Sequence, residues 1–147
     1  MKWRVPKTRK NTSTAANEIT CIVTASAAVV GARPAVRTRL KTRSGPVVML
    51  GAGGVTAEIK RSYCVRLAPV NLATATEMIE EVPELAILRG FRNLPHGDCA
   101  ALARAIRAMS LLACLKSRAV TEAEINPLIV KRQGSGVVAV DGLVVFT

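Results

Sequence analysis

The sequence predicts an α+β fold in which two helices pack on one face of a mainly antiparallel sheet. Short runs rich in Val and Ile are separated by Gly, Pro and Ser, which is typical of strands joined by turns. Two longer stretches, 72–81 and 99–115, repeat apolar residues at helical spacing. Because the helical stretches stand together between groups of strands, we expect them on one face of the sheet. The length of 147 residues suits a single domain.

The first 44 residues differ from the rest in charge. Residues 1–45 contain ten Lys or Arg and one acid, whereas residues 46–147 contain eleven bases and nine acids. We expect this basic segment to be disordered. Its apolar run Ile19–Ala32 is too short to span a bilayer, and it fits loosely either the hydrophobic part of a signal peptide or part of an Arg-rich transit peptide.

The net charge of +11 does not by itself predict a nucleic-acid reader. A basic tail on a nearly neutral body binds polyanions weakly and non-specifically, and the sequence has no recognition helix, aromatic platform or zinc finger. We therefore expect no specific nucleic-acid partner and no membrane partner. The four cysteines form no C-x-x-C pair, which indicates reduced thiols and a reducing compartment, the cytoplasm.

A glycine-rich loop follows the first predicted strand of the body, Val47–Leu50. Its residues Gly53 and Gly54 let another group approach the backbone. A phosphate cradle would need a helix next, but residues 55–60 alternate like a strand. The pattern therefore favours a tight hairpin or a substrate-facing loop. Glu58, the acid of this stretch, is most simply an exposed strand residue.

The middle of the chain predicts a third strand and the two helices. Tyr63–Leu67 is the strand. Asn71 is a suitable N-cap for the helix over 72–81, and Asp98 is one for the longer helix over 99–115. The apolar stripe of the longer helix predicts that this side of the helix packs in the core.

Two arginines lie between the helices. Arg89 and Arg92 have two interpretations: they grip a phosphate, or they pair with the acids of the preceding helix and its end. The sequence favours the pairing, with the phosphate role left open.

The C-terminal residues predict a hairpin. Residues 123–131 and 137–145 are the two strands, joined by a Gly- and Ser-containing turn centred on Gly134. In that register Asn126 falls opposite Asp141 to within one residue, and cross-strand neighbours have Cβ atoms roughly 5 Å apart.

This hairpin offers a candidate metal site. Glu124 projects to the same face as Asn126, because side chains alternate along a strand. Together with Asp141 they supply only oxygen ligands, which favour Mg²⁺ or Mn²⁺. The alternative is that Asn-Pro and Asp-Gly are simply turn dipeptides, and the pattern alone does not decide between the two.

Five sequence blocks, in order and at matching spacing, resemble the C-terminal part of the ATP-grasp domain in NDP-forming acyl-CoA synthetases. This family includes acetyl-CoA synthetases, is related to the succinyl-CoA synthetase β subunit, and also occurs fused in bacterial protein acetyltransferases. The blocks are Gly45–Lys60, Val65–Glu81, Leu88–Arg92, Gly97–Ile106 and Glu122–Val130, the last followed by Val137–Gly142.

The resemblance implies a partial ATP-grasp fold over residues 45–147 and a ligase chemistry. In that chemistry ATP, a carboxylic acid and CoA give acyl-CoA, ADP and phosphate. It implies that Asn126 and Asp141 bind Mg²⁺, or Mn²⁺, beside the nucleotide phosphates, and Glu124 belongs to the same motif. Other residues matching the blocks are candidates for nucleotide or phosphate binding: Gly53, Gly54, Glu58 and Arg92. The implied partners are ATP, CoA and the domains or subunit that bind CoA and carry the phosphohistidine.

The resemblance also has departures. Residues 1–44 show no counterpart of the preceding ATP-grasp half, and the charge changes where the resemblance begins. We therefore hypothesise that residues 1–44 are disordered or not native to the domain, and that the chain is a fragment or subunit inactive by itself. The alternatives are a non-catalytic, ligand-sensing segment of an acetyltransferase-type protein and a degenerate relic.

Overall fold

A computed structural model describes residues 2–4, 19–26, 45–53, 62–90, 95–115 and 120–146. The chain forms seven strands and three helical segments in these ranges. They are β1 (Lys2–Arg4), β2 (Ile19–Ser26), β3 (Val47–Ala52), β4 (Tyr63–Leu67), α2 (Leu72–Glu81), the 3₁₀ helix η1 (Pro83–Arg89), α3 (Cys99–Leu112), β5 (Val120–Val130), β6 (Val137–Ala139) and β7 (Gly142–Phe146).

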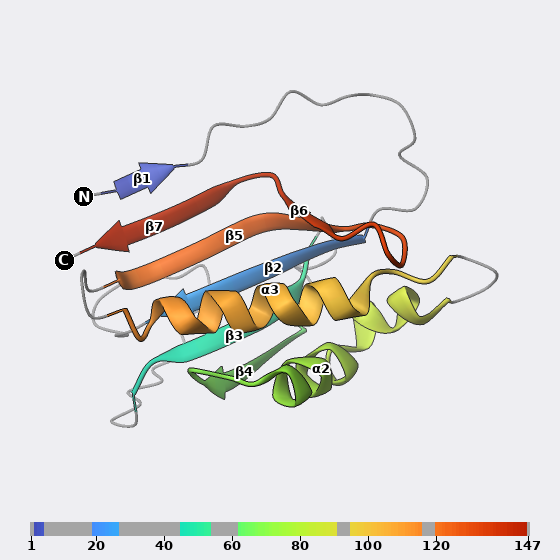
Figure 1. Ribbon diagram of the computed structural model, residues 1–147, viewed down its shortest axis with the longest axis horizontal. Coiled ribbons are helices and arrows are strands. Elements are labelled where there is room, and N and C mark those ends of the chain that lie inside the picture. Colours follow the sequence, from blue (N-terminus) through green and yellow to red (C-terminus); the bar gives the residue numbers. More distant parts are fainter. Residues whose placement is uncertain are drawn as a thin grey trace.

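The strands form one antiparallel sheet in the order β1-β7-β5-β2-β3-β4, and β6 pairs with β5 beside this path (Figure 1). Strand β2 joins the two halves of the sheet, because its residue Cys21 pairs with Ala52 of β3 on one side and with Leu128 of β5 on the other. The first and last strands also meet, since Trp3 of β1 pairs with Val144 of β7.

Part of the basic N-terminal segment lies in this sheet, which corrects the predicted disorder. Ile19–Ser26 is an uncharged run with several β-branched residues, and it forms β2 at the centre of the sheet. The apolar run Ile19–Ala32, whose composition fits a targeting segment, contributes its first eight residues to this strand. The sheet therefore does not divide at Gly45. The other residues of the segment, apart from β1, lie outside the described ranges.

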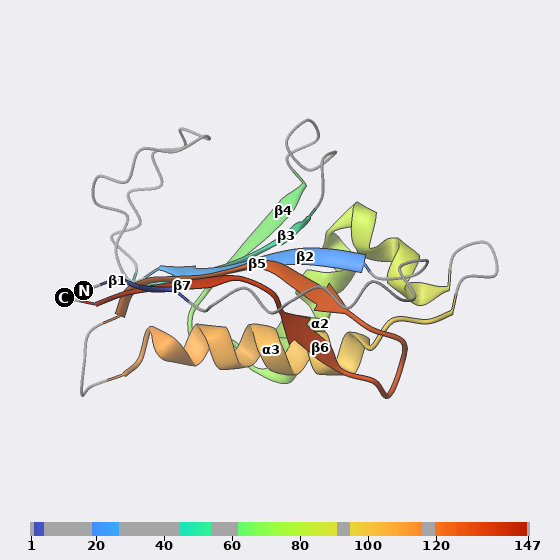
Figure 2. The same cartoon turned by 90° about the horizontal axis from the view of Figure 1, so that it is seen from above.

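The two predicted helices are present, and α3 lies along one face of the sheet (Figure 2). Helix α2 has the predicted bounds, and the Asn71 side chain accepts from the Thr74 N–H at 2.8 Å. Helix α3 ends at Leu112, three residues before the predicted end. In the described part of the chain, no helix is long and apolar enough to cross a membrane. The α+β prediction is confirmed.

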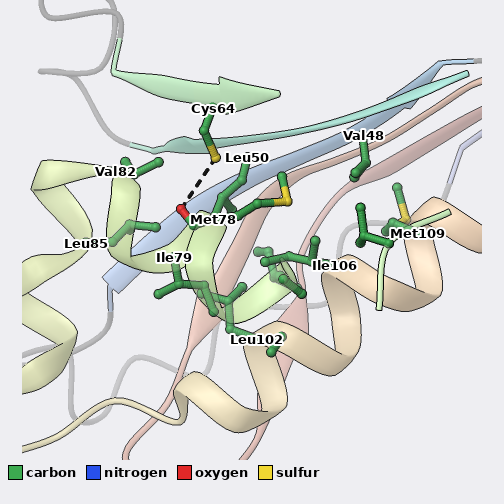
Figure 3. Packing of buried hydrophobic residues seen from close by; sticks show 14 of the residues in the cluster. Val48, Leu50, Cys64, Met78, Ile79, Val82, Leu85, Leu102, Ile106 and Met109 are labelled. Atoms are coloured by element: carbon green, nitrogen blue, oxygen red, sulfur yellow. Dashed lines mark hydrogen bonds between the residues drawn. The ribbon is translucent and has the colours of Figure 1, made fainter. Parts of the chain in front are cut away.

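The core lies between the sheet and the helices (Figure 3). Leu50 from β3, Met78 from α2, and Leu102 and Ile106 from α3 are all fully buried. Cys64 of β4 joins this cluster, and its thiol donates to the Met78 carbonyl at 3.4 Å. Burial, with a smaller effect of nearby Glu81, raises the pKa of this thiol to about 11, so Cys64 is a packing residue.

The loop before α3 packs so closely that Gly97 should not tolerate a side chain. A Cβ on Gly97 would lie 2.3 Å from Cδ2 of Leu88, and Leu88 is fully buried, so packed core residues must shift to make room. We expect Gly97→Ala to lower the free energy of unfolding by roughly 1–3 kcal/mol, measured by urea denaturation. Gly51→Ala is the control, because its Cβ would meet nothing nearer than 3.5 Å. Equal effects of both substitutions would contradict the expectation.

Asp98 caps α3 as predicted, and its buried side chain should make stability depend on pH. Hydrogen bonds from the N–H groups of Ala101 and Gly136 lower the pKa of this carboxyl below its ordinary 3.8. Because the folded-state pKa is the lower one, the stabilisation is present above pH 3.8 and is lost as the pH falls through the folded-state pKa.

Urea denaturation from about pH 5 to about pH 2.5 tests this linkage. The free energy of unfolding of the wild type should fall more steeply in the acid range than that of Asp98→Asn, which has no carboxyl to protonate at this position. Parallel curves for the two proteins would contradict the assignment.

Candidate functional site

The candidate site lies where β5 changes partners. Residues 120–125 of β5 pair with β7, whereas residues 128–130 pair with β6. The strand predicted over 137–145 is therefore wrong as one continuous element: it is broken at residues 140–141, between β6 and β7. Asp141 occupies this break, and the hairpin itself is present.

The predicted pairing of Asn126 with Asp141 is confirmed. The Asn126 N–H donates to the Asp141 carbonyl at 3.0 Å, and the Val140 N–H donates to the Pro127 carbonyl at 3.0 Å. The Asn126–Pro127 peptide bond is cis. These two hydrogen bonds hold the strands together where the regular ladders stop, so the backbone fixes Asp141 directly opposite Asn126.

Side-chain alternation places the polar residues on the sheet face opposite α3. Ala123 and Ile125 pack toward the core, so Glu124 and Asn126 project the other way. The Asn126 amide nitrogen donates to Glu124 Oε1 at 3.1 Å. Because an amide nitrogen only donates, Oδ1 is the Asn126 side-chain atom that can meet a cation.

A hollow of about 140 Å³ lies at this point, lined by Glu124, Asn126, Asp141, Gly142 and Leu143. The structure thus brings together all three predicted metal ligands. Asp141 is half-buried, and its Oδ1 atom is buried. The sequence did not single out Gly142 and Leu143. The hairpin register could have indicated them, because Gly142 follows Asp141 and Leu143 pairs with Glu124.

The donor set is small. Within the described ranges, no three His, Cys, Asp or Glu side chains gather as a metal-binding cluster. The hollow instead offers two carboxylates and one amide oxygen. This set fits Mg²⁺ or Mn²⁺, since Mg²⁺ takes one or two protein carboxylates and completes its shell with water and phosphate oxygens.

Of the other predicted site residues, only Gly53 lies in the described part of the chain, and it does not line this hollow. Gly53 is half-buried and directly follows β3. Strand β2 separates β3 from β5, so Gly53 lies roughly 10 Å across the sheet from β5. Gly54, Glu58 and Arg92 lie outside the described residues, as does the strand predicted over 55–60.

The acids near η1 have partners that the sequence did not predict. Glu81 forms an ion pair with Arg66 of β4, and Glu84 accepts from the Ser62 hydroxyl at 2.7 Å. Arg66 lies in β4 and Ser62 directly precedes it, so the two contacts tie this part of the chain to the helical segments. They come from pairings between segments, which helix spacing alone does not indicate.

Comparison with known proteins identifies the family. A family model described as an ATP-grasp domain matches residues 7–146. The chain belongs to the ATP-grasp family. The resemblance predicted from the five blocks is confirmed, and the match also extends into the N-terminal segment, where the sequence offered no recognised motif.

Relatives of this ATP-grasp chain include two archaeal ligases. The ADP-forming acetate–CoA ligase I of Archaeoglobus fulgidus is 37% identical over 94 residues, which make up 64% of this chain and 14% of that protein. The β subunit of the ADP-forming acetate–CoA ligase II of Pyrococcus furiosus is 31% identical over 102 residues, 69% of this chain and 43% of the subunit. The chain thus spans less than half the length of each.

A solved structure has the same fold. It is the dinucleotide-forming acetyl-coenzyme A synthetase 1 of Ca. Korarchaeum cryptofilum in complex with coenzyme A and Mg-AMPPCP. Its TM-score with this ATP-grasp chain is 0.70 at 26% identity, over 88% of this chain and 53% of that one.

Proposed function

We propose that this chain supplies the magnesium and nucleotide corner of an ADP-forming acyl-CoA synthetase. Such an enzyme converts ATP, a carboxylic acid and CoA into acyl-CoA, ADP and phosphate. The observation that carries the proposal is the hollow in which Glu124, Asn126 and Asp141 meet on the sheet face opposite α3. The ADP-forming ligases among the relatives, and a neighbour that binds Mg-AMPPCP, support it.

Asn126 and Asp141 would be the protein ligands of Mg²⁺, or of Mn²⁺, with Glu124 beside them. A bound metal would neutralise and orient the phosphates of ATP or ADP. The chain's own contribution is to prepare the ligands. The backbone bond from Asn126 to Asp141 sets the spacing between the strands, and Glu124 holds the Asn126 amide so that its oxygen is left for the cation.

The nucleotide would extend from this corner across the sheet toward β3. Gly53 and Gly54 would allow a phosphate to approach the backbone after β3. Glu58 and Arg92 complete the proposed nucleotide and phosphate set, on the basis of the motifs in which they occur.

The remaining steps are assigned to partners. CoA binding and the phosphohistidine relay would belong to other domains or to another subunit of the synthetase, so we expect no acyl-CoA formation by the chain alone. Residues 45–147 would correspond to the C-terminal half of the ATP-grasp domain, with β2 contributed to its sheet by the preceding segment.

Calorimetric titration of the full chain tests the nucleotide proposal. Mg·ATP should release heat that disappears when EDTA removes the metal, and ATP without metal should bind much more weakly. No heat with Mg·ATP would overturn the proposal. In a parallel assay with acetate, CoA and ATP, acetyl-CoA formation by the chain alone would contradict the assignment of the remaining steps to partners.

A further inference from the structure

We propose that Asp98 is a positioning residue for the metal corner, holding the hairpin that carries Asp141 against the start of α3. The inference rests on the proposed function of that corner. It assigns to Asp98 a task beyond capping the helix, and it concerns a contact between residues 38 positions apart in the sequence.

Asp98 binds both ends of the turn between β5 and β6. One carboxylate oxygen, Oδ1, caps α3 by accepting from the Ala101 N–H at 2.9 Å. The other, Oδ2, accepts from the Gly136 N–H at 2.9 Å. The Asp98 N–H donates to the Lys131 carbonyl at 2.9 Å, and Lys131 N–H donates to the Gly136 carbonyl at 3.1 Å. The side chain at the centre of these bonds is only 6% exposed.

The residues before Asp98 extend the same contact. Gly97 forms a β-bridge with Arg132, and the Gln133 N–H donates to the His96 carbonyl at 2.8 Å. The loop entering α3 therefore runs beside the turn, with Asp98 at the point where the loop becomes helix.

A short path leads from this anchor to the metal corner. Gly136 directly precedes β6, whose three residues pair with β5, and Asp141 follows after Val140. Beyond β6, the chain is held to β5 by the bonds from Val140 to Pro127 and from Asn126 to Asp141. The hydrogen bond from the Gly136 N–H to Asp98 thus fixes the start of the segment 136–141, and the end of that segment carries the Asp141 carboxylate.

Helix capping alone does not account for the chemistry at position 98. A cap needs one acceptor, as Asn71 demonstrates at α2 with a single bond to Thr74. Asp98 uses both carboxylate oxygens, one on the Ala101 N–H and the other on the Gly136 N–H. An asparagine would still cap the helix, but it would turn an NH₂ donor toward the Gly136 N–H.

Mn²⁺ binding by Asp98→Asn tests the inference. Titration of the full chain with Mn²⁺ alone, with free Mn²⁺ read by electron paramagnetic resonance, should give about tenfold weaker binding than wild type, as is typical when the support of a metal ligand is lost. Asp98→Ser, which caps a helix but has no second oxygen, should behave alike. Asn71→Ala is the control: it removes a cap that has no contact with the hairpin, so Mn²⁺ affinity should not change.

Amide hydrogen exchange supplies a readout that needs no metal. The Val140 and Asn126 amides should exchange faster in Asp98→Asn, while the Ala101 amide, still capped, keeps its protection. If Asp98→Asn changes neither Mn²⁺ binding nor amide protection, the inference about Asp98 is wrong, while the proposed metal corner still stands. A wild-type chain that binds no Mn²⁺ would overturn the proposed metal corner, and with it the role of Asp98 toward that corner.

Discussion

Replacing Asp141 by alanine should weaken the binding of Mg·ATP by more than about 100-fold. Loss of an outer-shell partner already costs 10- to 100-fold in metal affinity, and Asp141 is proposed as a direct ligand. The fold should persist, because Asp141 contacts Asn126 through its backbone carbonyl, which alanine keeps. Calorimetric titration with Mg·ATP measures the affinity, and urea denaturation checks the fold.

Glu122→Ala is the matched control for charge. Glu122 lies two residues before Glu124 on the same face of β5 but does not line the hollow. A carboxylate that is not a ligand contributes under about 1 kcal/mol, so affinity should change by at most about fivefold. If Asp141→Ala and Glu122→Ala weaken binding equally, Asp141 acts only through its charge and the ligand assignment is wrong.

Replacing Leu102 by alanine should lower the free energy of unfolding by about 2–5 kcal/mol. Leu102 is fully buried between α3 and the sheet, where removing its side-chain atoms loses apolar contacts and leaves a cavity. Urea denaturation at neutral pH measures the change.

Leu111→Ala makes the same chemical change on the same helix at a side chain that is 39% exposed. Its effect should stay within about 1 kcal/mol, because a partly exposed side chain loses fewer apolar contacts and leaves no enclosed cavity when it is shortened. Comparable losses for both variants would contradict the assigned role of Leu102 in packing α3 on the sheet, because alanine has the higher helix propensity at either position.

The sequence was sufficient for elements that local signals define. Asn71 and Asp98 mark the starts of α2 and α3, and the apolar spacing behind them fixes the face that packs on the sheet. The pairing of Asn126 with Asp141 was also predictable, because a short turn sets the register of the hairpin.

The sequence was not sufficient where partners lie far apart in the chain. Strand β2 has no turn connecting it to β5, so its place at the centre of the sheet depends on pairing that no local pattern reveals. The break at Asp141 arises because β5 exchanges β7 for β6. The hydrogen bond from the Gly136 N–H to Asp98 could not be predicted either, because its partners lie far apart in the sequence. The helix cap that Asp98 forms with Ala101 is a local signal and was predicted.

The central place of β2 also sets an order of events during synthesis. This strand leaves the ribosome early and can pair with β3 soon afterwards, but its other edge must wait until β5 has been made, and β1 must wait for β7. Until then the nascent chain carries an open strand edge, the feature most prone to intermolecular pairing. A chain released before Val120 should therefore aggregate rather than accumulate as a partly folded monomer.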